Sequence, residues 1–360
     1  MIHAVILAGG WGSRFWPQSR KKFPKQLLCI AKGYSPLENL LKILRPQIPR
    51  ERIWLVTNQE HLQGLCRQLP GLSRKNILAE PLAKNTAAAI GWAAVTVKKA
   101  DPQALMVVLS SDQIFGQKKL IWQAIRDACK RAREQNALVV MGIRPNRAAT
   151  EYGYLKIARR RGKIQNSRIY KVEKFTEKPN LKSAQRFFKN KNYLWNAGIF
   201  VWQAAAILEA FKKYLPKTYA GLENIDKAFG RRQYSAQLVK AYRRFKNISI
   251  DYGILEKARN IYAVVGNFLW RDLGSWQSLA QGILRPDGMG NVVSGLHKGI
   301  KTKNSVIFSG DKHLIATLGV HNLVIVHTPS ATLVCRKDQA QDVKKLTHAL
   351  EKDQRFKKYL

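Results

Sequence analysis

The sequence is poor in acidic residues, in cysteine and in long apolar runs. Only 23 Asp and Glu stand against 63 Lys and Arg, so the formal net charge is +40. No apolar run approaches the ~20 residues of a membrane-spanning helix, which predicts a chain without membrane spans. The four cysteines are widely spaced and form no CxxC pair. That spacing argues against a disulfide framework or a structural zinc site and favours the cytoplasm.

The N-terminal residues, MIHAVILAGG, contain no basic leader and no small-residue cleavage site. They are typical of a first β-strand rather than of a signal peptide. Together with the cysteine pattern, this predicts a cytoplasmic protein.

The excess of positive charge suggests a polyanionic partner, because such a field attracts nucleic acid and phosphorylated molecules. The basic residues are, however, spread along the whole chain, and no basic-aromatic platform of the RNA-binding type stands out. We therefore interpret them mainly as a solvated surface. A nucleic-acid-binding protein is the less favoured alternative, and the charge is still expected to raise affinity for a small phosphorylated substrate.

Short apolar runs alternate with amphipathic segments in the first part of the chain. The apolar runs predict buried strands at 3–8, 52–57, 104–111 and 137–143. Helical spacing predicts helices at 36–44, 85–100 and 120–135. Asn85 and Thr86 are candidate caps of the second of these helices. The alternation predicts an α/β fold with a parallel sheet and helices on both faces.

The pattern changes near residues 150 and 288. Two strands around a turn-prone basic stretch at 159–163 come first, followed by further helices. From 288 onward, short segments punctuated by Gly, Asn and Asp indicate a small all-β unit that is closed by a helix. We therefore divide the chain into domains of residues 1–287 and 288–360.

The most specific motif is VILAGGWGSRFWPQSRKKFPKQLL, residues 5–28. A strand delivers the chain to Gly9, Gly10 and Gly12, whose backbone can approach a ligand and form an anion nest. Arg14 adds a guanidinium that can hold phosphate oxygens in two contacts. Neither the GxGxxG of dinucleotide-binding folds nor the GK[ST] of a P-loop is present. A tight turn without a ligand is the alternative, but the basic residues that follow favour a phosphate.

This motif resembles the opening of the sugar-nucleotide pyrophosphorylases. Trp16-Pro17 followed by Pro24-Lys25-Gln26 is most similar to the mannose-1-phosphate guanylyltransferases, with Ser13 in place of the usual Thr. The resemblance covers essentially the full chain, through EPLAKNTAAAIGWAA, VLSSDQIF, TEYGYLKI, FTEKP, LWNAGIFVW, ISIDYGILEKA and LWRDLGSWQSL. It implies a Rossmann-like nucleotidyltransferase domain with a mixed, mainly parallel sheet over 1–287. A short β-helix-like domain with a closing helix is implied for 288–360, and no phosphomannose isomerase activity is expected.

The resemblance implies transfer of GMP from GTP to α-D-mannose 1-phosphate, with pyrophosphate released and Mg²⁺ as cofactor. The attacking phosphate is already an anion, so positioning and charge neutralisation can carry the reaction without a general base. This fits a sequence without a visible Ser-His-Asp or Cys-His arrangement, and we interpret the seven histidines as structural or surface residues. The same chemistry on another NTP or another sugar phosphate, such as a heptose phosphate, is the alternative. The β tail could supply the surface of a homodimer.

Matching positions imply the site residues. The nucleotide is expected at Leu7, Gly9, Gly10, Gly12, Ser13, Arg14, Lys25, Glu80, Asn85 and Asp112. The sugar phosphate is expected at Gly153, Glu177, Lys178, Asn196 and Asp251. Three of these residues are the candidate catalytic groups, because they can neutralise phosphate charge: Arg14, Lys25 and Lys178. A solvated surface lysine is the alternative for the last of them.

Asp112 and Asp272 are the candidate Mg²⁺ ligands. Each lies in apolar surroundings, where an acid is costly without a partner, and Mg²⁺ prefers one or two carboxylates plus substrate oxygens. The residues alone leave open a helix cap for Asp112 or Asp251 and an ion pair with Arg271 for Asp272. Gln113 replaces the His that usually follows the aspartate in the family. The hypothesis requires the two candidate ligands to lie together in the fold.

Overall fold

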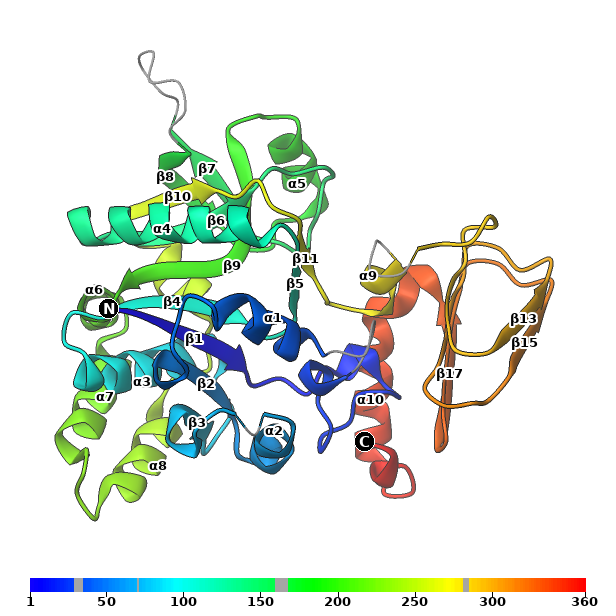
Figure 1. Ribbon diagram of the computed structural model, residues 1–360, viewed down its shortest axis with the longest axis horizontal. Coiled ribbons are helices and arrows are strands. Elements are labelled where there is room, and N and C mark those ends of the chain that lie inside the picture. The colour runs from blue at the N-terminus through cyan, green and yellow to red at the C-terminus, as the bar shows by residue number, and fades with distance from the viewer. Residues whose placement is uncertain (29–34, 70, 159–167, 281–284) are drawn as a thin grey trace.

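The computed structural model describes residues 1–28, 35–69, 71–158, 168–280 and 285–360. A large α/β domain carries a small β domain at one end (Figure 1). The predicted turn at 159–163 lies outside the described residues, as does Cys29.

The large domain is built on one mixed sheet. Its strands are β1 (Ile2–Ala8), β2 (Ile53–Asn58), β3 (Ile77–Glu80), β4 (Leu105–Ser110), β6 (Leu138–Ile143), β7 (Tyr154–Ile157), β8 (Ile169–Thr176), β9 (Tyr193–Gln203) and β10 (Ile261–Val265). They form a nine-stranded sheet in the order β3-β2-β1-β4-β9-β6-β10-β8-β7. The first four strands in this order are parallel, as the alternating pattern predicted. β9 runs antiparallel between β4 and β6, and β8 runs antiparallel to β10 and β7, so the sheet is mixed.

Helices cover both faces of this sheet, which confirms the predicted layering. They are α1 (Pro36–Leu44), α2 (Leu62–Gln68), α3 (Asn85–Ala100), α4 (Lys118–Gln135), α5 (Leu181–Phe188), α6 (Ala204–Tyr214), α7 (Pro216–Ala228) and α8 (Tyr234–Arg244). Alternate residues of β1 enter the two cores: Val5 packs with α3, α6, α7 and α8, and its neighbours Ala4 and Ile6 pack with α1, α2 and α4. This alternation follows from the two-residue period of a strand.

The start of α3 corrects one expectation. The helix begins at Asn85, but neither Asn85 nor Thr86 caps it with a side chain. Asn85 instead has a positive φ of 65°, and its carboxamide oxygen accepts a hydrogen bond from the amide of Thr86 at 2.8 Å. The Thr86 hydroxyl accepts from the amide of Ile250 at 2.9 Å. A tertiary contact has therefore taken the hydroxyl of Thr86, and a local contact has taken the carboxamide of Asn85.

The small domain is a short coil of β-strands. β12 (Val292–Ser294), β14 (Val306–Ser309) and β16 (Leu323–Thr328) pair in parallel, and β17 (Ala331–Arg336) closes the sheet antiparallel to β16. A second pair, β13 (His297–Ile300) and β15 (Ile315–Leu318), is also parallel. Helix α10 (Val343–Lys352) follows the strands. Parallel pairing between strands that recur at short intervals gives the β-helical architecture that was expected for this part of the chain.

Shorter elements complete the description. The two-stranded ribbon of β5 (Gln113–Phe115) and β11 (Trp270–Asp272) and helix α9 (Trp276–Ala280) join the two domains. Single helical turns occur at Ser13–Phe15, Lys25–Leu27, Arg50–Arg52, Gln59–His61, Arg74–Asn76, Asp251–Leu255, Lys337–Asp342 and Lys357–Tyr359.

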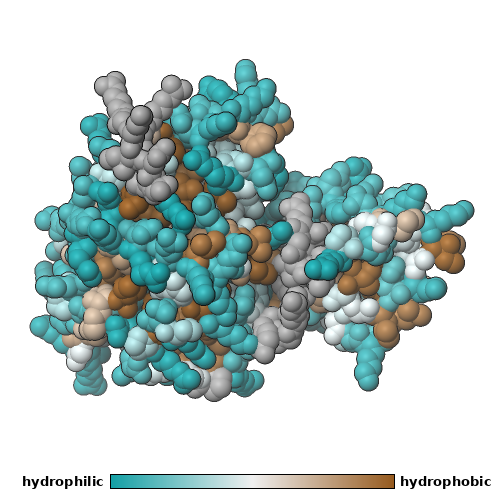
Figure 2. All heavy atoms as spheres, turned by 45° about the horizontal axis from the view of Figure 1, so that its top comes forward, coloured by the Kyte–Doolittle hydropathy of each residue, from teal (hydrophilic) through white to brown (hydrophobic). Residues whose placement is uncertain are grey.

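The surface is predominantly polar. The face shown in Figure 2 is mostly hydrophilic, with apolar side chains in separated patches, some of them on the small domain. Among the described residues, no helix has the length and apolar character to cross a membrane.

Candidate active site

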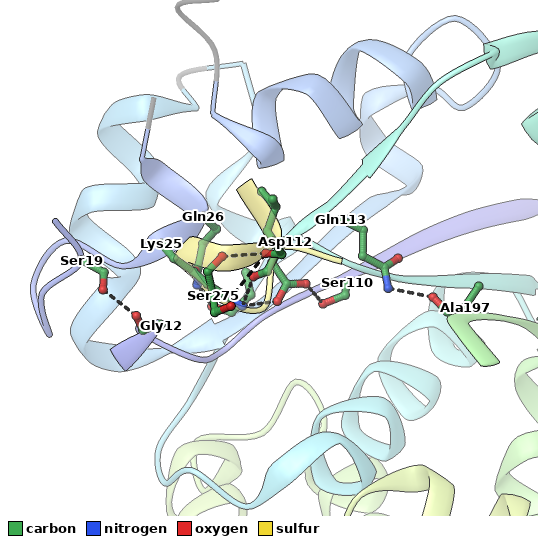
Figure 3. Close-up of polar contacts among 12 residues, drawn as sticks. Gly12, Ser19, Lys25, Gln26, Ser110, Asp112, Gln113, Ala197 and Ser275 are labelled. Carbon is green, nitrogen blue, oxygen red and sulfur yellow. Dashed lines mark hydrogen bonds and ion pairs between the residues drawn. The ribbon is translucent and has the colours of Figure 1, made fainter. Parts of the chain in front are cut away.

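The glycine turn follows β1 at the carboxyl end of the parallel strands. Gly12 has a φ of 77°, and a Cβ at this position would overlap the side chain of Lys25. Among the described residues, a Cβ at Gly10 would instead meet no atom within 4 Å, so they leave space beside this backbone. The hydroxyl of Ser19 donates to the carbonyl of Gly12 at 2.6 Å and fixes the turn (Figure 3). The turn thus presents open backbone on one side and packs tightly on Lys25 on the other.

Asp112 follows β4, the neighbour of β1 in the sheet. Its carboxylate pairs with the ammonium of Lys25 and accepts a hydrogen bond from the hydroxyl of Ser110 (Figure 3). Burial opposes ionisation of Asp112, but the charge of Lys25 and these hydrogen bonds outweigh it and lower its pKa. The alternative of a helix cap is wrong, because Asp112 lies between β4 and β5.

Asp272 lies beside Asp112 because β11 pairs antiparallel with β5. Asp272 is opposite Gln113 in the ribbon, and the amide of Leu273 donates to the backbone carbonyl of Asp112 at 3.1 Å. Burial and the negative charge of Asp112 raise the pKa of Asp272 to about 7. Within the described ranges, Asp272 forms no ion pair with Arg271, whose Nε atom is buried without a hydrogen-bond partner. The structure therefore brings the two candidate metal ligands together.

The carboxylate pair fits a hard divalent cation by its chemistry. Oxygen donors are those that Mg²⁺ prefers, and a cation would relieve the repulsion that raises the pKa of Asp272. In the described part of the chain, no group of three or more His, Cys, Asp or Glu side chains could hold a metal ion. A cation at this pair would therefore need oxygens from bound substrates to complete its coordination.

A cavity of about 340 Å³ lies on the Asp112 side of the pair. Its lining includes seven of the ten residues expected to bind nucleotide: Leu7, Gly9, Gly10, Lys25, Glu80, Asn85 and Asp112. It also includes residues that sequence reasoning missed, among them Gln26, Asn58, Lys84, Thr86, Ser110 and Ser111. Asn58 ends β2 and could have been found from the rule that ligands bind beyond the carboxyl ends of parallel strands.

Glu80 is the buried acid of this cavity. Its side chain accepts a hydrogen bond from the hydroxyl of Tyr242 at 3.2 Å. Burial raises the pKa of Glu80 to about 8, although the hydrogen bond from Tyr242 opposes the shift. Glu80 therefore binds a proton at neutral pH until a ligand or a nearby cation favours its charged form.

A second cavity, of about 670 Å³, lies on the Asp272 side of the pair. Arg14 and Lys178 line it together with Asp272. The cavity thus receives cationic side chains from the glycine turn, from the segment after β8 and, through Arg147, from the segment between β6 and β7. Its other lining residues were not expected from the sequence. They come from three separate segments and include Arg147, Tyr152, Ser275 and Gln341.

The remaining sugar-site candidates form one polar cluster. The Asn196 carboxamide donates to Asp251 at 3.0 Å, and the ammonium of Lys178 donates to Glu177 at 2.6 Å. A Cβ at Gly153 would overlap a carboxylate oxygen of Glu177, and that oxygen is buried without a hydrogen-bond partner. The cluster therefore keeps a free acceptor of the kind that binds a hydroxyl group.

The contacts of this cluster exclude the capping role of Asp251 but leave the alternative for Lys178 open. Asp251 begins a π-helical turn but makes no side-chain cap. Burial, followed by the charge of Glu177, raises the pKa of Asp251 to about 7. The Lys178 side chain is 57% exposed, so the alternative of a solvated lysine stays open, but the ammonium pairs with the buried Glu177 and the residue has a positive φ of 44°.

Comparison with known proteins assigns both domains. The nucleotidyl transferase family matches residues 3–285, and the mannose-P isomerase/GMP-like β-helix domain family matches residues 295–350. A mannose-1-phosphate guanylyltransferase from Salmonella muenchen is 36% identical over 99% of this chain and 75% of its own length. One from Escherichia coli (strain K12) is 34% identical over 98% of this chain and 74% of its own length.

A solved structure shows the same fold over nearly the whole chain. The crystal structure of a mannose-1-phosphate geranyltransferase from Thermus thermophilus superposes with a TM-score of 0.86 at 33% sequence identity. The match covers 97% of this chain and 99% of that one, so it includes both domains and the ribbon that joins them.

Proposed function

Because this chain belongs to the nucleotidyl transferase family and, within it, to the mannose-1-phosphate guanylyltransferases, we propose that it transfers GMP from GTP to α-D-mannose 1-phosphate. The observation that carries the proposal is the position of Asp112 and Asp272 between two cavities. One cavity holds the glycine turn and suits a triphosphate. The other receives Arg14 and Lys178 and suits a sugar phosphate.

The residues of the chain can support an in-line displacement at the α-phosphate. The nucleophile is an anionic phosphate oxygen, so no side chain needs to remove a proton. Lys25, which lines the first cavity, would neutralise charge on the triphosphate and on the departing pyrophosphate, and Arg14 and Lys178, which line the second cavity, would hold the attacking phosphate. The open backbone at Gly10 lets phosphate oxygens approach its N–H group.

A divalent cation completes the proposal. Asp112 and Asp272 would hold Mg²⁺, which supplies charge neutralisation to the reacting phosphates when bound. Lys25 provides positive charge to Asp112. Asp272 has no such ion pair within the described residues, and burial and the charge of Asp112 raise its pKa to about 7 against the opposing charges of Lys25, Arg14 and Lys178.

Glu80 supports guanine as the base. Guanine presents two donors, N1–H and the N2 amino group, on the edge where adenine presents an acceptor at N1. An ionised carboxylate accepts two such hydrogen bonds at once. Glu80 lines the nucleotide cavity and has one oxygen free of Tyr242. We therefore assign base recognition to Glu80 and place the nucleoside between it and Asn85.

We propose two further properties on less direct grounds. A homodimer could use the small domain, where large apolar side chains are exposed at Leu296, Ile300, Leu314 and Leu318. Light scattering of the purified protein measures this. The cytoplasm remains the expected setting, because the cysteines are few and unpaired in the sequence.

A substrate panel with a pyrophosphate readout tests the function. We expect turnover with GTP and mannose 1-phosphate in the presence of Mg²⁺, and none with either substrate alone. Faster turnover with a heptose phosphate, another hexose phosphate or another NTP would change the assigned substrate but leave the assigned reaction type as it is. Absence of turnover with every pair, combined with tight and salt-dependent RNA binding, would favour the nucleic-acid-binding alternative.

A further inference from the structure

The small β domain and the glycine turn share one hydrophobic core. This core is separate from the two cores of the large domain and includes Phe15 and Trp16 of the turn and Leu273 and Trp276 after β11. The small domain contributes the side chains of its strands and closing helix: Val306, Phe308, Val324, Val326, Leu333 and Val343. Figure 1 shows the turn after β1 lying against α10. Removing the small domain would therefore expose the interior of the catalytic turn.

Trp276 lies at the centre of this core. It is fully buried, and its ring centroid lies 5.2 Å from that of Phe15 and 5.2 Å from that of Phe308 in β14. Its indole N–H donates to the carbonyl of Trp16 at 3.2 Å. Phe15 directly follows Arg14, and Trp276 follows closely after Asp272 in the sequence. One side chain thus contacts the segments that carry Arg14 and Asp272 and also the β domain.

Polar contacts reinforce the same connection. The Arg20 guanidinium donates to the carbonyl of Tyr359 at 2.6 Å and to the hydroxyl of Ser330 at 2.6 Å. The indole N–H of Trp16 donates to the same Tyr359 carbonyl at 2.9 Å. These bonds join the end of the glycine motif to the turn before β17 and to the residues after α10.

A third contact reaches the cavity wall. The Gln341 carboxamide, which comes from the segment between β17 and α10, donates to the hydroxyl of Ser275 at 3.3 Å. Both residues line the 670 Å³ cavity together with Arg14 and Asp272. The small domain therefore contributes directly to the wall of the sugar-phosphate side of the site.

We propose that the small β domain is a positioning platform for the catalytic turn, and that Trp276 is the positioning residue that sets Arg14 relative to Asp272. The expected effect of this positioning on the rate of nucleotidyl transfer rests on the proposed function. Charge stabilisation by fixed groups depends on their placement, and a shift of about 1 Å can reduce a rate by roughly 100-fold. A platform packed into the same core limits such shifts in a turn that has no regular strand or long helix of its own.

Hydrogen exchange tests the positioning without reference to activity. Trp276→Leu should raise amide exchange in residues 9–16 by at least ~10-fold, because local opening of the turn becomes easier. Trp202→Leu is the matched control, since Trp202 is also fully buried but lies in the core that packs against α3 and α6. Equal exchange of residues 9–16 in the two variants would overturn the proposal. If Trp276→Leu does not fold, Trp276→Phe keeps an aromatic ring but removes the hydrogen bond to Trp16 and part of the buried side-chain volume.

Kinetics test the consequence for catalysis. Trp276→Phe and Arg20→Ala should each lower kcat by about 10-fold or more, with a much smaller change in KM for GTP, because the groups they position act on the transition state. Arg20→Lys should retain part of the kcat that Arg20→Ala loses. Glu351→Gln is the control: it breaks an exposed ion pair between Lys21 and α10 and should leave kcat unchanged.

The outcomes separate the two proposals. If the wild-type protein turns over no substrate pair, the proposed function fails, and hydrogen exchange alone decides the positioning role. If the wild type is active and Trp276→Phe and Arg20→Ala match Glu351→Gln in kcat, the platform proposal is wrong and the proposed function stands.

Discussion

Asp272 and Gln113 stand opposite each other in an antiparallel ribbon, and this pairing places Asp272 beside Asp112. The two carboxylates come from the ends of strands that are far apart in sequence. The short ribbon of β5 and β11 is therefore the element that creates the candidate metal site.

Asp272→Asn should separate metal binding from folding. Removing one of two buried carboxylates relieves their repulsion, so the melting temperature without metal should stay the same or rise. The stabilisation on adding Mg²⁺ should disappear and turnover should fall by roughly 100-fold or more. Calorimetry with and without Mg²⁺ measures this. Asp226→Asn, at an exposed position, serves as control. A Mg²⁺-dependent shift that survives in Asp272→Asn would contradict the assignment.

The raised pKa of Glu80 predicts a specific pH dependence of the free energy of unfolding. The unfolded chain releases this proton near pH ~4.3, whereas the folded protein holds it up to about pH 8. Between these values the folded state binds more protons, so the Glu80 contribution to the free energy of unfolding falls as pH rises. Glu80→Gln removes this contribution. Urea unfolding should show the variant gaining stability relative to wild type from about pH 5 to about pH 8. A constant difference would show that Glu80 ionises normally.

Glu80 should also determine the preference for guanine. ITP lacks the N2 amino group of GTP but keeps N1–H, so it offers one donor fewer to the carboxylate. The wild type should favour GTP over ITP in kcat/KM by about 10-fold or more, as expected for a hydrogen bond to a charged group. Glu80→Gln should lose most of this preference, because a carboxamide offers one acceptor and a mismatched donor. An unchanged ratio would place base recognition elsewhere.

Gly10 and Gly12 should respond differently to alanine. Gly12→Ala introduces a Cβ at positive φ that overlaps Lys25, so it should lower the free energy of unfolding by at least ~1–2 kcal/mol. Gly10→Ala meets no protein atom within 4 Å and should leave stability close to wild type. Its Cβ should instead raise KM for GTP, because it occupies the space beside the turn. Equal KM values for Gly10→Ala and wild type would exclude a close backbone approach of the triphosphate.

Gln113 should couple the metal pair to the sugar site. Its carboxamide is buried and donates to the carbonyl of Ala197, next to Asn196, at 2.7 Å (Figure 3). Gln113→Ala leaves that carbonyl unpaired and should cost about 1–3 kcal/mol of stability. It should also raise KM for mannose 1-phosphate more than KM for GTP. Gln113→His keeps a ring N–H as donor and should recover most of both losses. Equal increases in the two KM values would argue against a specific link to Asn196.

The local structure of this chain could largely be predicted from its sequence. Apolar runs located β1, β2, β4 and β6, and helical periodicity located α1 and α3 with their observed bounds. β9 was not assigned as a strand, and its place between β4 and β6 has no local signal because it depends on pairing with both neighbours. The capping role of Thr86 failed because the amide of Ile250 takes its hydroxyl, and that of Asn85 failed because its side chain accepts from the adjacent amide of Thr86.

The sequence by itself determined the chemical groups: the glycines that free the backbone, the cations that follow them and the acids set in apolar surroundings. These properties depend on residue type and near neighbours. Only the tertiary structure decided that Asp272 meets Asp112, that Lys25 pairs with that acid, and that Trp276 joins the turn to the β domain. Such contacts form between segments distant in the chain, and the free energy of the complete core, rather than any local preference, holds them together.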